Sequence, residues 1–411
     1  MRLPDNKSSD ANWRDFSVDP AIRLERERAW IEGDGAVNLD GRLTYQSYLS
    51  LGTLLVSQKP ASRIPDERVF IVTHQLAELT FKQILFDCEV LARIFTVGAK
   101  AAKAGGLKEF LALKKPKGDL ILEVEGERVS LSSLDRIYWP AEKLTKFDLL
   151  SYYLKLSSYI MPFLKDRPAI LQRYPRGIKA PMFFQQDTST APSFIKTVPL
   201  VNQEGREVNY SVYTTLASLL HFVNLGTIEQ HPWHSTLQHL DKPDYLMLDL
   251  DPKQAPWKNV LAVALVCKEV LDELGLPAFP KTSGSSGIHV YLPLRPKYDY
   301  RRVAAIAEGL AAEVARRAPK IATIQRSLAK RQKQQVYVDA LQNARGKTIA
   351  AAFSARAKDG ATASMPLTWK QIEKGVKISD FTIENLPGLI KKHGDAWRDF
   401  FESRHELNLP K

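Results

Sequence analysis

The sequence is poor in cysteine and has no long apolar run, and each lack excludes a class of protein. Its two cysteines, Cys88 and Cys267, are too few for a disulfide scaffold or a cysteine-based zinc site, and they suit a reducing cytoplasm. The best apolar stretch, Val260 to Cys267, falls well short of the roughly 20 residues that a membrane-spanning helix needs. The polar start MRLPDNKSSD does not have the pattern of a signal peptide. We therefore expect a cytoplasmic protein without a membrane partner.

Composition is that of an ordinary globular chain, but the charge is not. Hydrophobic residues make up 44%, charged residues 25% and aromatic residues 9% of the 411 residues, which excludes disordered and collagen-like chains and suits two or three domains. The net charge of +12 favours a polyanionic partner over a surface that is merely soluble. Residues 1–105 hold 14 basic and 14 acidic residues, so the whole surplus lies in the remainder. The two parts of the chain therefore differ in net charge, which suggests that they are different domains.

The amino-terminal part has helical periodicity. Apolar residues recur at helical spacing from Pro65 to Phe95, and Leu43 to Leu55 has a shorter pattern of the same kind, so we predict two helices. Gly98 to Gly118 is rich in Lys, Ala and Gly with little periodicity, which predicts a linker. We place the domain boundary near residue 115, with a helical fragment plus linker over 1–115 and a second domain over 116–411.

Beyond the boundary, short β-rich runs alternate with helical patterns. The predicted strands are Leu120 to Glu125, Val208 to Tyr213, Tyr245 to Leu250, Ile288 to Leu294 and Val336 to Leu341. The predicted helices are Phe147 to Leu164, Thr214 to Leu225, Lys258 to Leu274 and Tyr300 to Ala318. This mixture predicts an α/β or α+β class. The basic stretch Lys320 to Lys333 has two interpretations, a solvated surface or a nucleic-acid contact.

Two aspartates end one predicted strand, Tyr245-Leu-Met-Leu-Asp-Leu-Asp-Pro. Asp249 and Asp251 are two residues apart, and the period of a strand places both carboxylates on one face. Magnesium and manganese prefer such oxygens, and a third acid would allow a pair of ions for phosphoryl transfer. Two solvated acids at the end of a strand would give the same pattern, so the pair alone leaves both interpretations open.

A glycine-rich turn leads into the next strand in Lys281-Thr-Ser-Gly-Ser-Ser-Gly-Ile-His-Val-Tyr. Gly284 and Gly287 permit the backbone amides to approach an anion such as a phosphate closely. Ser283 adds a hydroxyl donor, and His289 can point from the strand toward the same spot. The alternative is a plain hairpin turn with a half-buried histidine.

A third acid lies inside an apolar strand. In Val336-Tyr-Val-Asp-Ala-Leu, Asp339 interrupts the apolar residues, and an unpaired buried carboxylate is so unfavourable that a metal, a base or a solvent cleft should meet it. Arg345, Lys347 and Arg356 follow and would neutralise a triphosphate, although each also suits a surface charge.

Five further motifs occur in a fixed order with these three elements. They are Leu131-Ser-Ser-Leu-Asp-Arg-Ile-Tyr-Trp-Pro, Thr145-Lys-Phe-Asp-Leu-Leu-Ser-Tyr-Tyr, Gln172-Arg-Tyr-Pro-Arg-Gly-Ile, Phe183-Phe-Gln-Gln and Ile228-Glu-Gln-His-Pro-Trp. With them, residues from about 119 to 411 resemble the polymerase domain of bacterial DNA ligase D, in the archaeo-eukaryotic primase superfamily. The resemblance implies a primase-polymerase fold with an RRM-like catalytic sheet.

The resemblance also implies roles for individual residues. Asp249, Asp251 and Asp339 would bind two catalytic ions, manganese or magnesium. The incoming triphosphate would be held by His231, Ser283, His289 and Arg356, to which Lys347 is added by its charge. Phe183 and Phe184 would stack on template bases. Arg136 and Lys146 would grip the 5′-phosphate of a gap or break.

Three positions depart from the family pattern. Gln172 stands where the family usually has lysine, Ser286 replaces the usual lysine of the glycine-rich turn, and Gln186 replaces a commonly basic residue. The loss of two phosphate-directed charges would weaken nucleotide affinity or mark a stand-alone relative.

The first part resembles another family. Leu39-Asp-Gly-Arg-Leu-Thr-Tyr-Gln-Ser-Tyr-Leu and Phe70-Ile-Val-Thr-His-Gln-Leu-Ala-Glu-Leu are similar to the amino-terminal region of tryptophan 2,3-dioxygenase, an all-helical enzyme. His74 matches the distal histidine of its haem pocket. The resemblance ends near residue 96, without the haem-ligating histidine, so we expect no haem and interpret His74 as a packed side chain.

The resemblance predicts a template-directed nucleotidyltransferase that extends primers at DNA gaps and double-strand breaks in end-joining repair. By family it would prefer ribonucleotides, work beside the bacterial nucleoid, and act with a Ku-type end-binding protein and a separate ATP-dependent DNA ligase. One alternative is a non-catalytic DNA-end-binding module that has lost nucleotide affinity. Another is a metal-dependent transferase or nuclease that needs no template.

Overall fold

The chain divides into two compact units, Met1–Val97 and Gly98–Lys411. The computed structural model describes residues 106–188, 191–202 and 205–407, and the backbone alone of 38–39, 43–44 and 102–104. In the first unit, β1 (Asn38–Leu39) pairs antiparallel with β2 (Leu43–Thr44).

Most of the predicted amino-terminal features cannot be compared with the structure. Leu43 and Thr44, where the shorter predicted helix would begin, form the strand β2 instead. The rest of that predicted helix, the helix predicted over 65–95, and the side chains of His74 and Cys88 lie outside the described residues.

The stretch predicted to be a linker contains regular structure, so that prediction was wrong. The strand β3 (Ala102–Ala104) pairs in parallel with β4 (Leu120–Val124), and the helix α5 (Leu107–Ala112) follows β3. Phe110 of α5 is fully buried, with its ring centroid 5.0 Å from that of Phe147. The richness in Lys, Ala and Gly concealed three apolar residues at helical spacing, Leu107, Phe110 and Leu111, and their burial stabilises the helix.

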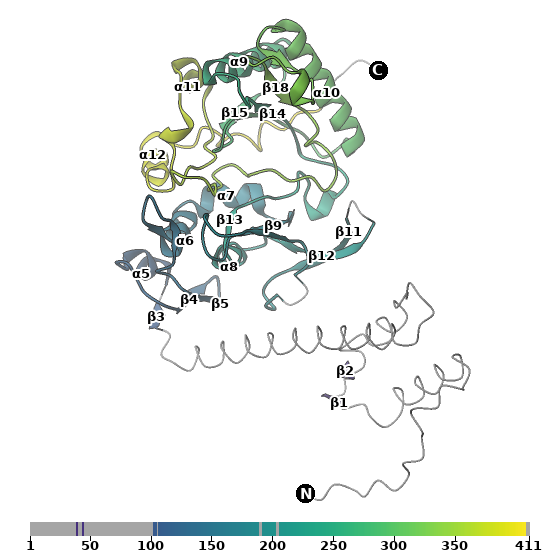
Figure 1. The fold of residues 1–411 in the computed structure, drawn as a ribbon. Helices are drawn as coiled ribbons and strands as arrows, with labels where there is room; N and C mark the ends of the chain where they lie inside the picture. The colour runs from purple at the N-terminus through teal and green to yellow at the C-terminus, as the bar shows by residue number, and fades with distance from the viewer. Residues whose placement is uncertain are drawn as a thin grey trace, which may run out of the picture. The chain divides into compact units, whose positions relative to one another are not determined.

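A five-stranded sheet forms one end of the second unit, with the strand order β15-β16-β14-β18-β17. All its neighbours are antiparallel except the parallel pair β17 and β18. Two long helices pack on it and on each other (Figure 1). The bounds are β14 (Tyr245–Asp251), β15 (Phe279–Thr282), β16 (Ile288–Pro293), β17 (Ala322–Thr323), β18 (Val336–Asp339), α9 (Trp257–Glu273) and α10 (Tyr300–Arg317).

Smaller sheets and short helices form the other end of this unit (Figure 1). Their strands are β5 (Glu127–Leu131), β6 (Ile137–Trp139), β7 (Leu144–Thr145), β8 (Pro168–Ala169), β9 (Leu171–Arg173), β10 (Phe183–Gln185), β11 (Thr197–Val201), β12 (Glu207–Val212) and β13 (Thr227–Glu229). The helices at this end include α6 (Lys146–Lys155), α7 (Ser157–Leu164) and α8 (Leu216–Asn224). The helix α11 (Trp369–Lys374) instead packs against α9 beside the five-stranded sheet, and α12 (Leu386–His393) follows it in the chain (Figure 1).

The mixed α/β class and the predicted strands are confirmed, as are three of the four predicted helices. The helix predicted over Phe147 to Leu164 is instead two helices, α6 and α7. The backbone leaves the helical conformation at Leu156, with φ −104° and ψ 10°. Apolar periodicity continues through both helices, so it carried no signal of the break. Within the described residues, no helix is long and apolar enough to cross a bilayer.

Aromatic packing and buried hydroxyls join the two ends of the unit. The ring of Phe163 in α7 lies 5.7 Å from Trp397 and 5.4 Å from Phe400. The buried Tyr152 hydroxyl donates to the Phe353 carbonyl at 2.7 Å, and the buried Tyr153 hydroxyl donates to the Ile228 carbonyl at 2.6 Å. These contacts place the end of β13 beside the segment that follows β18.

An asparagine side chain fixes the turn after β18. Asn343 is buried, and its amide accepts from the Met247 N–H at 2.9 Å and donates to the Met247 carbonyl at 2.7 Å. The side chain therefore continues the hydrogen-bonded edge of β14 where β18 has already ended. Asp339, the last residue of β18, is thereby held beside β14.

Candidate active site

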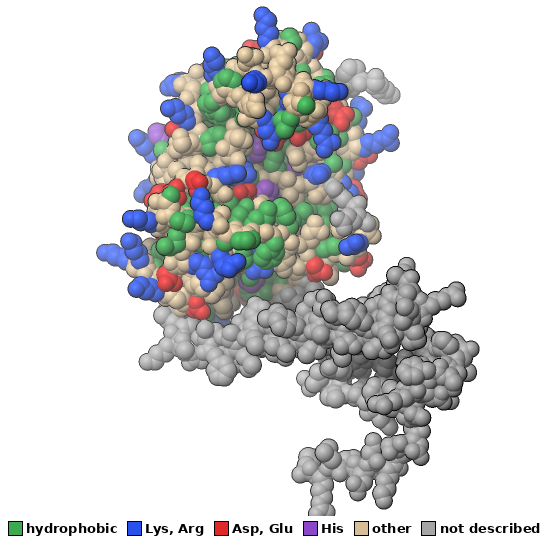
Figure 2. All heavy atoms as spheres, in the orientation of Figure 1, with side chains coloured by type: hydrophobic (Ala, Val, Ile, Leu, Met, Phe, Trp, Pro, Cys, Tyr) green, Lys and Arg blue, Asp and Glu red, His purple; other side chains and the backbone are tan. Residues whose placement is uncertain are grey.

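Six of the eight residues predicted to bind metal or nucleotide line one cavity of about 210 Å³. It lies beside the end of β14 and the start of β16. Figure 2 shows histidine and acidic side chains near the middle of the described unit, with Lys and Arg side chains around them. The lining residues are His231, Asp249, Asp251, Ser283, Ser285, Ser286, Gly287, His289, Gln342, Thr348, Ile349, Ala350 and Arg356.

Strand register sets four charged or titratable residues in one row across the sheet. Lys281 of β15 is opposite His289 of β16, His289 is opposite Asp249 of β14, and Asp249 is opposite Asp339 of β18. Directly opposite residues of antiparallel strands have Cβ atoms roughly 5 Å apart, so the row is continuous. His289 Nε2 is 3.5 Å from Asp249 Oδ1. The row therefore runs from a lysine through an imidazole to two acids.

The three predicted acids affect one another electrostatically. Burial, and then the negative charges of Asp339 and Asp251, raise the pKa of Asp249 to about 7. Asp249 and Asp251 line the cavity, whereas Asp339 Oδ1 accepts from the Leu341 N–H at 2.7 Å. A bound cation would relieve this crowding of carboxylates.

The residues present fit a divalent ion that shares its coordination with a substrate. Within the described residues, no group of three or more His, Cys, Asp or Glu side chains is arranged to hold a metal ion by itself. Magnesium commonly takes only one or two protein carboxylates and completes its shell with water and substrate phosphates. The two cavity-facing carboxylates, Asp249 and Asp251, match that donor set.

The glycine-rich turn differs from the expected anion cradle. The backbone N–H groups of residues 285, 286 and 287 all donate to Ser283 Oγ, at 3.0 to 3.1 Å. The amides are therefore engaged by the turn's own hydroxyl group. Gly287 is required for close packing, since a Cβ there would lie 2.2 Å from the Leu250 carbonyl oxygen. The turn brings Ser283 and Ser286 to the cavity wall.

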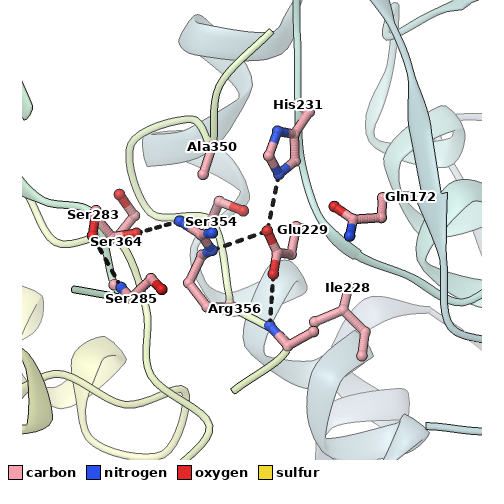
Figure 3. Close-up of polar contacts among 12 residues, drawn as sticks. Gln172, Ile228, Glu229, His231, Ser283, Ser285, Ala350, Ser354, Arg356 and Ser364 are labelled. Atoms are coloured by element: carbon pink, nitrogen blue, oxygen red, sulfur yellow. Dashed lines mark hydrogen bonds and ion pairs between the residues drawn. The ribbon is translucent and has the colours of Figure 1, made fainter. Parts of the chain in front are cut away.

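A buried glutamate that the sequence analysis missed connects two predicted residues (Figure 3). Glu229 Oε2 accepts from His231 Nε2 at 2.9 Å and forms an ion pair with Arg356 Nε at 3.0 Å. Its Oε1 accepts from the Ala357 N–H at 2.9 Å. Burial opposes the ionisation of Glu229, but the His231 hydrogen bond and the Arg356 charge outweigh it and lower its pKa to about 2. The available signal was the place of Glu229 in the motif Ile228-Glu-Gln-His-Pro-Trp.

A fully buried lysine was missed as well. Lys281 Nζ donates to the Ala350 carbonyl at 2.9 Å and to Ser364 Oγ at 2.6 Å, and it lies 2.9 Å from His289 Nδ1. Burial, and then the Arg356 charge, lower the pKa of Lys281 well below its usual value, and the Asp249 charge opposes this. The three partners match the three donors of an ammonium group. His289 Nδ1 then accepts, and Nε2 carries the ring proton toward the cavity and Asp249.

The two residues predicted to grip a 5′-phosphate lie together, but only one is exposed. Lys146 Nζ is buried and donates to the Ser132 carbonyl at 2.7 Å. Arg136 Nη1 donates to the Pro175 carbonyl at 2.7 Å. Burial, and then the Arg136 charge, lower the pKa of Lys146 to about 7, and the Asp119 charge opposes this. Their juxtaposition concentrates positive charge at one place.

The predicted aromatic pair is exposed on β10, with Phe183 46% and Phe184 61% accessible. The Arg173 guanidinium lies 5.1 Å from the centroid of the Phe183 ring. Gln172, opposite Phe184 in the register, donates to the Tyr174 hydroxyl at 2.7 Å. Lys347 is exposed outside the cavity lining. The exposed rings offer flat apolar faces.

The fold is that of a known polymerase domain. A solved structure of the polymerase domain from Mycobacterium tuberculosis ligase D in complex with DNA matches with a TM-score of 0.63 and 24% sequence identity, over 68% of this chain and 99% of that chain. Residues 145–397 match the family model for the LigD primase-polymerase domain. The chain belongs to this family.

Two LigD proteins also match this chain over part of their own length. The bifunctional non-homologous end joining protein LigD of Bacillus subtilis (strain 168) is 30% identical over 285 residues, which is 69% of this chain and 46% of that protein. The multifunctional non-homologous end joining protein LigD of Pseudomonas aeruginosa is also 30% identical, over 68% of this chain and 34% of that protein. The match thus spans less than half of either relative.

The amino-terminal resemblance is confirmed too. Residues 33–115 match the family model for tryptophan 2,3-dioxygenase, further than the expected end near residue 96. The tryptophan 2,3-dioxygenase of Anaeromyxobacter sp. (strain K) is 41% identical over 73 residues, which is 18% of this chain and 28% of that protein. The chain therefore begins with a short dioxygenase-like fragment.

The buried lysine gives a stability prediction. Lys281→Met would leave the Ala350 carbonyl, Ser364 Oγ and His289 Nδ1 without their donor, so we expect the free energy of unfolding to fall by about 2–3 kcal/mol. Urea denaturation measures it. The matched control is Lys370→Met at an exposed position of α11, where the change should stay within about 0.5 kcal/mol. Equal stability of the two variants would contradict the role of the three contacts.

Proposed function

We propose that the chain is a template-directed nucleotidyltransferase that extends a primer 3′ end at DNA gaps and double-strand breaks. The observation that carries this proposal is the cavity in which two carboxylates, two histidines and an arginine meet, in a chain of the LigD primase-polymerase family. The relatives are described as end-joining proteins, and a structural neighbour was solved with DNA. The five-stranded sheet would be the RRM-like catalytic sheet of the domain over 116–411.

Asp249, Asp251 and Asp339 would hold two divalent ions, manganese or magnesium. Such ions supply Lewis acidity that activates the attacking 3′-hydroxyl and offsets charge on the leaving pyrophosphate. The binding of an ion by Asp249 and Asp251 would also remove the repulsion between them. Positioning of the reactants by the chain then accounts for much of the acceleration.

Four cavity residues beside these acids would bind the triphosphate. They are His231, Ser283, His289 and Arg356, which line the same cavity as Asp249 and Asp251. With Nδ1 of His289 engaged by Lys281, Nε2–H is the nitrogen that can donate to a phosphate oxygen. Lys347 would add charge at the rim. These donors orient the triphosphate for in-line attack by the primer.

Side chains outside the cavity would contact the DNA. Phe183 and Phe184 would stack on template bases, because base stacking on an aromatic side chain is tolerant of sequence. Arg136 and Lys146 would bind the 5′-phosphate across the gap. A Ku-type partner, a separate ATP-dependent ligase, a preference for ribonucleotides and a place beside the bacterial nucleoid follow from the family resemblance and belong to the same proposal.

The second candidate is a DNA-end-binding module without catalysis. It is favoured by Ser286, which lines the cavity with a neutral hydroxyl where a lysine was expected, and by Gln172, whose amide is bonded to Tyr174. Such a module would bind DNA ends and add no nucleotides.

The decisive variant is Asp249→Asn, which keeps the shape of the side chain and removes its charge. We expect primer extension on gapped, 5′-phosphorylated DNA to fall about 1000-fold or more, because loss of the ion site removes its contribution to the transition state. DNA binding, measured by fluorescence anisotropy, should change by less than about threefold. The reason is that Asp249 lines the cavity, whereas DNA affinity comes mainly from contacts to the DNA phosphates. Parallel loss of both would contradict the role, and a wild-type protein that binds but never extends would favour the second candidate.

Lys146 gives a prediction on pH. The 5′-phosphate is a dianion above about pH 6 and favours the charged lysine. Since the pKa of Lys146 in the DNA-free protein is lowered to about 7, its protonation becomes costly as the pH rises. The preference for 5′-phosphorylated over 5′-hydroxyl gapped DNA should therefore fall by about tenfold between pH 7 and pH 9. Lys146→Met should show a smaller preference that is independent of pH, and Arg136→Met a smaller one that retains the fall. A wild-type preference that is flat over this range would contradict the assignment.

A further inference from the structure

Glu229 contacts two side chains that line the proposed triphosphate pocket, His231 and Arg356, without lining the pocket itself. It is the last residue of β13, and its side chain is 5% accessible. His231 follows it by two residues in the chain, whereas Arg356 comes from the segment beyond β18 (Figure 3). One carboxylate thus joins two parts of the chain that are far apart in sequence.

The contacts determine which donors remain for a ligand. A carboxylate with a pKa near 2 is ionised at neutral pH and only accepts, so His231 Nε2 carries a proton and Nδ1 is the nitrogen left for the cavity. In Arg356, Nε faces Glu229 and Nη1 donates to the Ser283 carbonyl at 2.5 Å. Among the described residues, these contacts leave the Nη2 edge of the guanidinium for an anion.

The same contacts keep the two side chains close together. The Arg356 guanidinium and the positive end of the His231 Nε2–H dipole repel each other, and this repulsion is stronger in a partly buried site than in water. The carboxylate between them offsets this repulsion and fixes both orientations. Ala357 N–H holds the second carboxylate oxygen at 2.9 Å, so Glu229 itself has little freedom to move.

We propose that Glu229 is a positioning residue for nucleotide binding, which orients His231 and Arg356 so that their remaining nitrogens meet the triphosphate. The inference rests on the proposed function, because it takes the triphosphate as the ligand of this pocket. Glu229 touches no reacting atom. Its effect reaches the substrate through the two side chains that it holds.

Asp244 offers a matched control elsewhere in the fold. Its side chain is 4% accessible, and its Oδ2 lies 2.6 Å from Arg167 Nη2 and 2.6 Å from Arg404 Nη2. It is therefore also a buried carboxylate between two cationic groups, but neither it nor its partners line the cavity. A purely structural loss should look alike at the two positions.

The experiment compares wild type, Glu229→Gln, Glu229→Asp and Asp244→Asn in primer extension on gapped DNA at saturating concentration. The KM for the nucleoside triphosphate and kcat are measured, together with the inhibition constant of inorganic tripolyphosphate supplied with equimolar Mg²⁺. Tripolyphosphate has no base or sugar, so it reports on the phosphate contacts alone. Thermal unfolding is followed for each variant.

Glu229→Gln should raise the KM for the nucleotide and the inhibition constant of tripolyphosphate together, by about tenfold or more, while kcat changes less. Glu229→Asp keeps the charge and should recover part of the loss. Asp244→Asn should lower the unfolding temperature and leave both constants at the wild-type values.

The proposal is overturned if Glu229→Gln and Asp244→Asn change the constants equally, or if KM rises and tripolyphosphate inhibition does not. If Glu229→Gln does not fold, Glu229→Asp carries the comparison, and wild-type constants in it would contradict the proposal. Failure of the wild type to extend any primer would instead refute the proposed function. Calorimetric binding of Mg²⁺-tripolyphosphate to the same proteins would then still test the role of Glu229.

Discussion

The pairing register of β14 decides which face of the sheet carries the Asp249 side chain, and the proposed active site is built around that side chain. β14 is the middle strand of its sheet and pairs antiparallel with β16 on one side and β18 on the other. A slip of one residue would turn Asp249 and Asp251 to the opposite face and replace them with Leu248 and Leu250. The buried Asn343 side chain, bonded to both backbone groups of Met247, opposes such a slip. The row Lys281, His289, Asp249 and Asp339 is therefore a consequence of backbone pairing.

Each of the two histidines of the cavity is held by a different kind of partner, a lysine for His289 and a glutamate for His231. Lys281 donates to Nδ1 of His289 and leaves Nε2–H for the cavity, while Glu229 accepts from Nε2 of His231 and leaves Nδ1. Both partners are buried, so water does not compete for these bonds. Groups fixed in this way need little reorganisation when a charged ligand arrives, which is the basis of electrostatic preorganisation.

Sequence patterns predicted the strands well because apolar alternation and Asp-x-Asp are local signals. They also identified the charged and titratable residues of the cavity lining, through the family motifs around His231, Asp249 and His289 and the basic residue Arg356. Glu229 and Lys281 were missed because their partners are distant in the chain: Arg356 comes 127 residues after Glu229, and Ala350 comes 69 residues after Lys281. A charged residue in an apolar strand indicates that a partner exists, and only the fold shows which one.

Local sequence patterns also failed to predict two other features, the hydrogen bonding of the glycine-rich turn and the helix α5. The glycine-rich turn was predicted to offer its amides to an anion, but Ser283 Oγ engages them, because a hydroxyl at the start of a tight turn competes with any outside acceptor. The short helix α5 was taken for linker because its few apolar residues lie in a Lys- and Ala-rich context, and their burial against the core decides the outcome. In both cases the local structure is determined by a specific contact that cannot be inferred from amino-acid composition.

The central claim is that Asp249 and Asp251 bind a metal ion that also contacts a triphosphate. The most direct measurement is a crystal structure of the protein with Mn²⁺ and a non-hydrolysable nucleoside triphosphate analogue, with the ion located by anomalous scattering. The account predicts an ion within coordination distance of both carboxylates, with the triphosphate extending toward His231 and Arg356. An ion bound elsewhere, or a triphosphate outside this cavity, would contradict it.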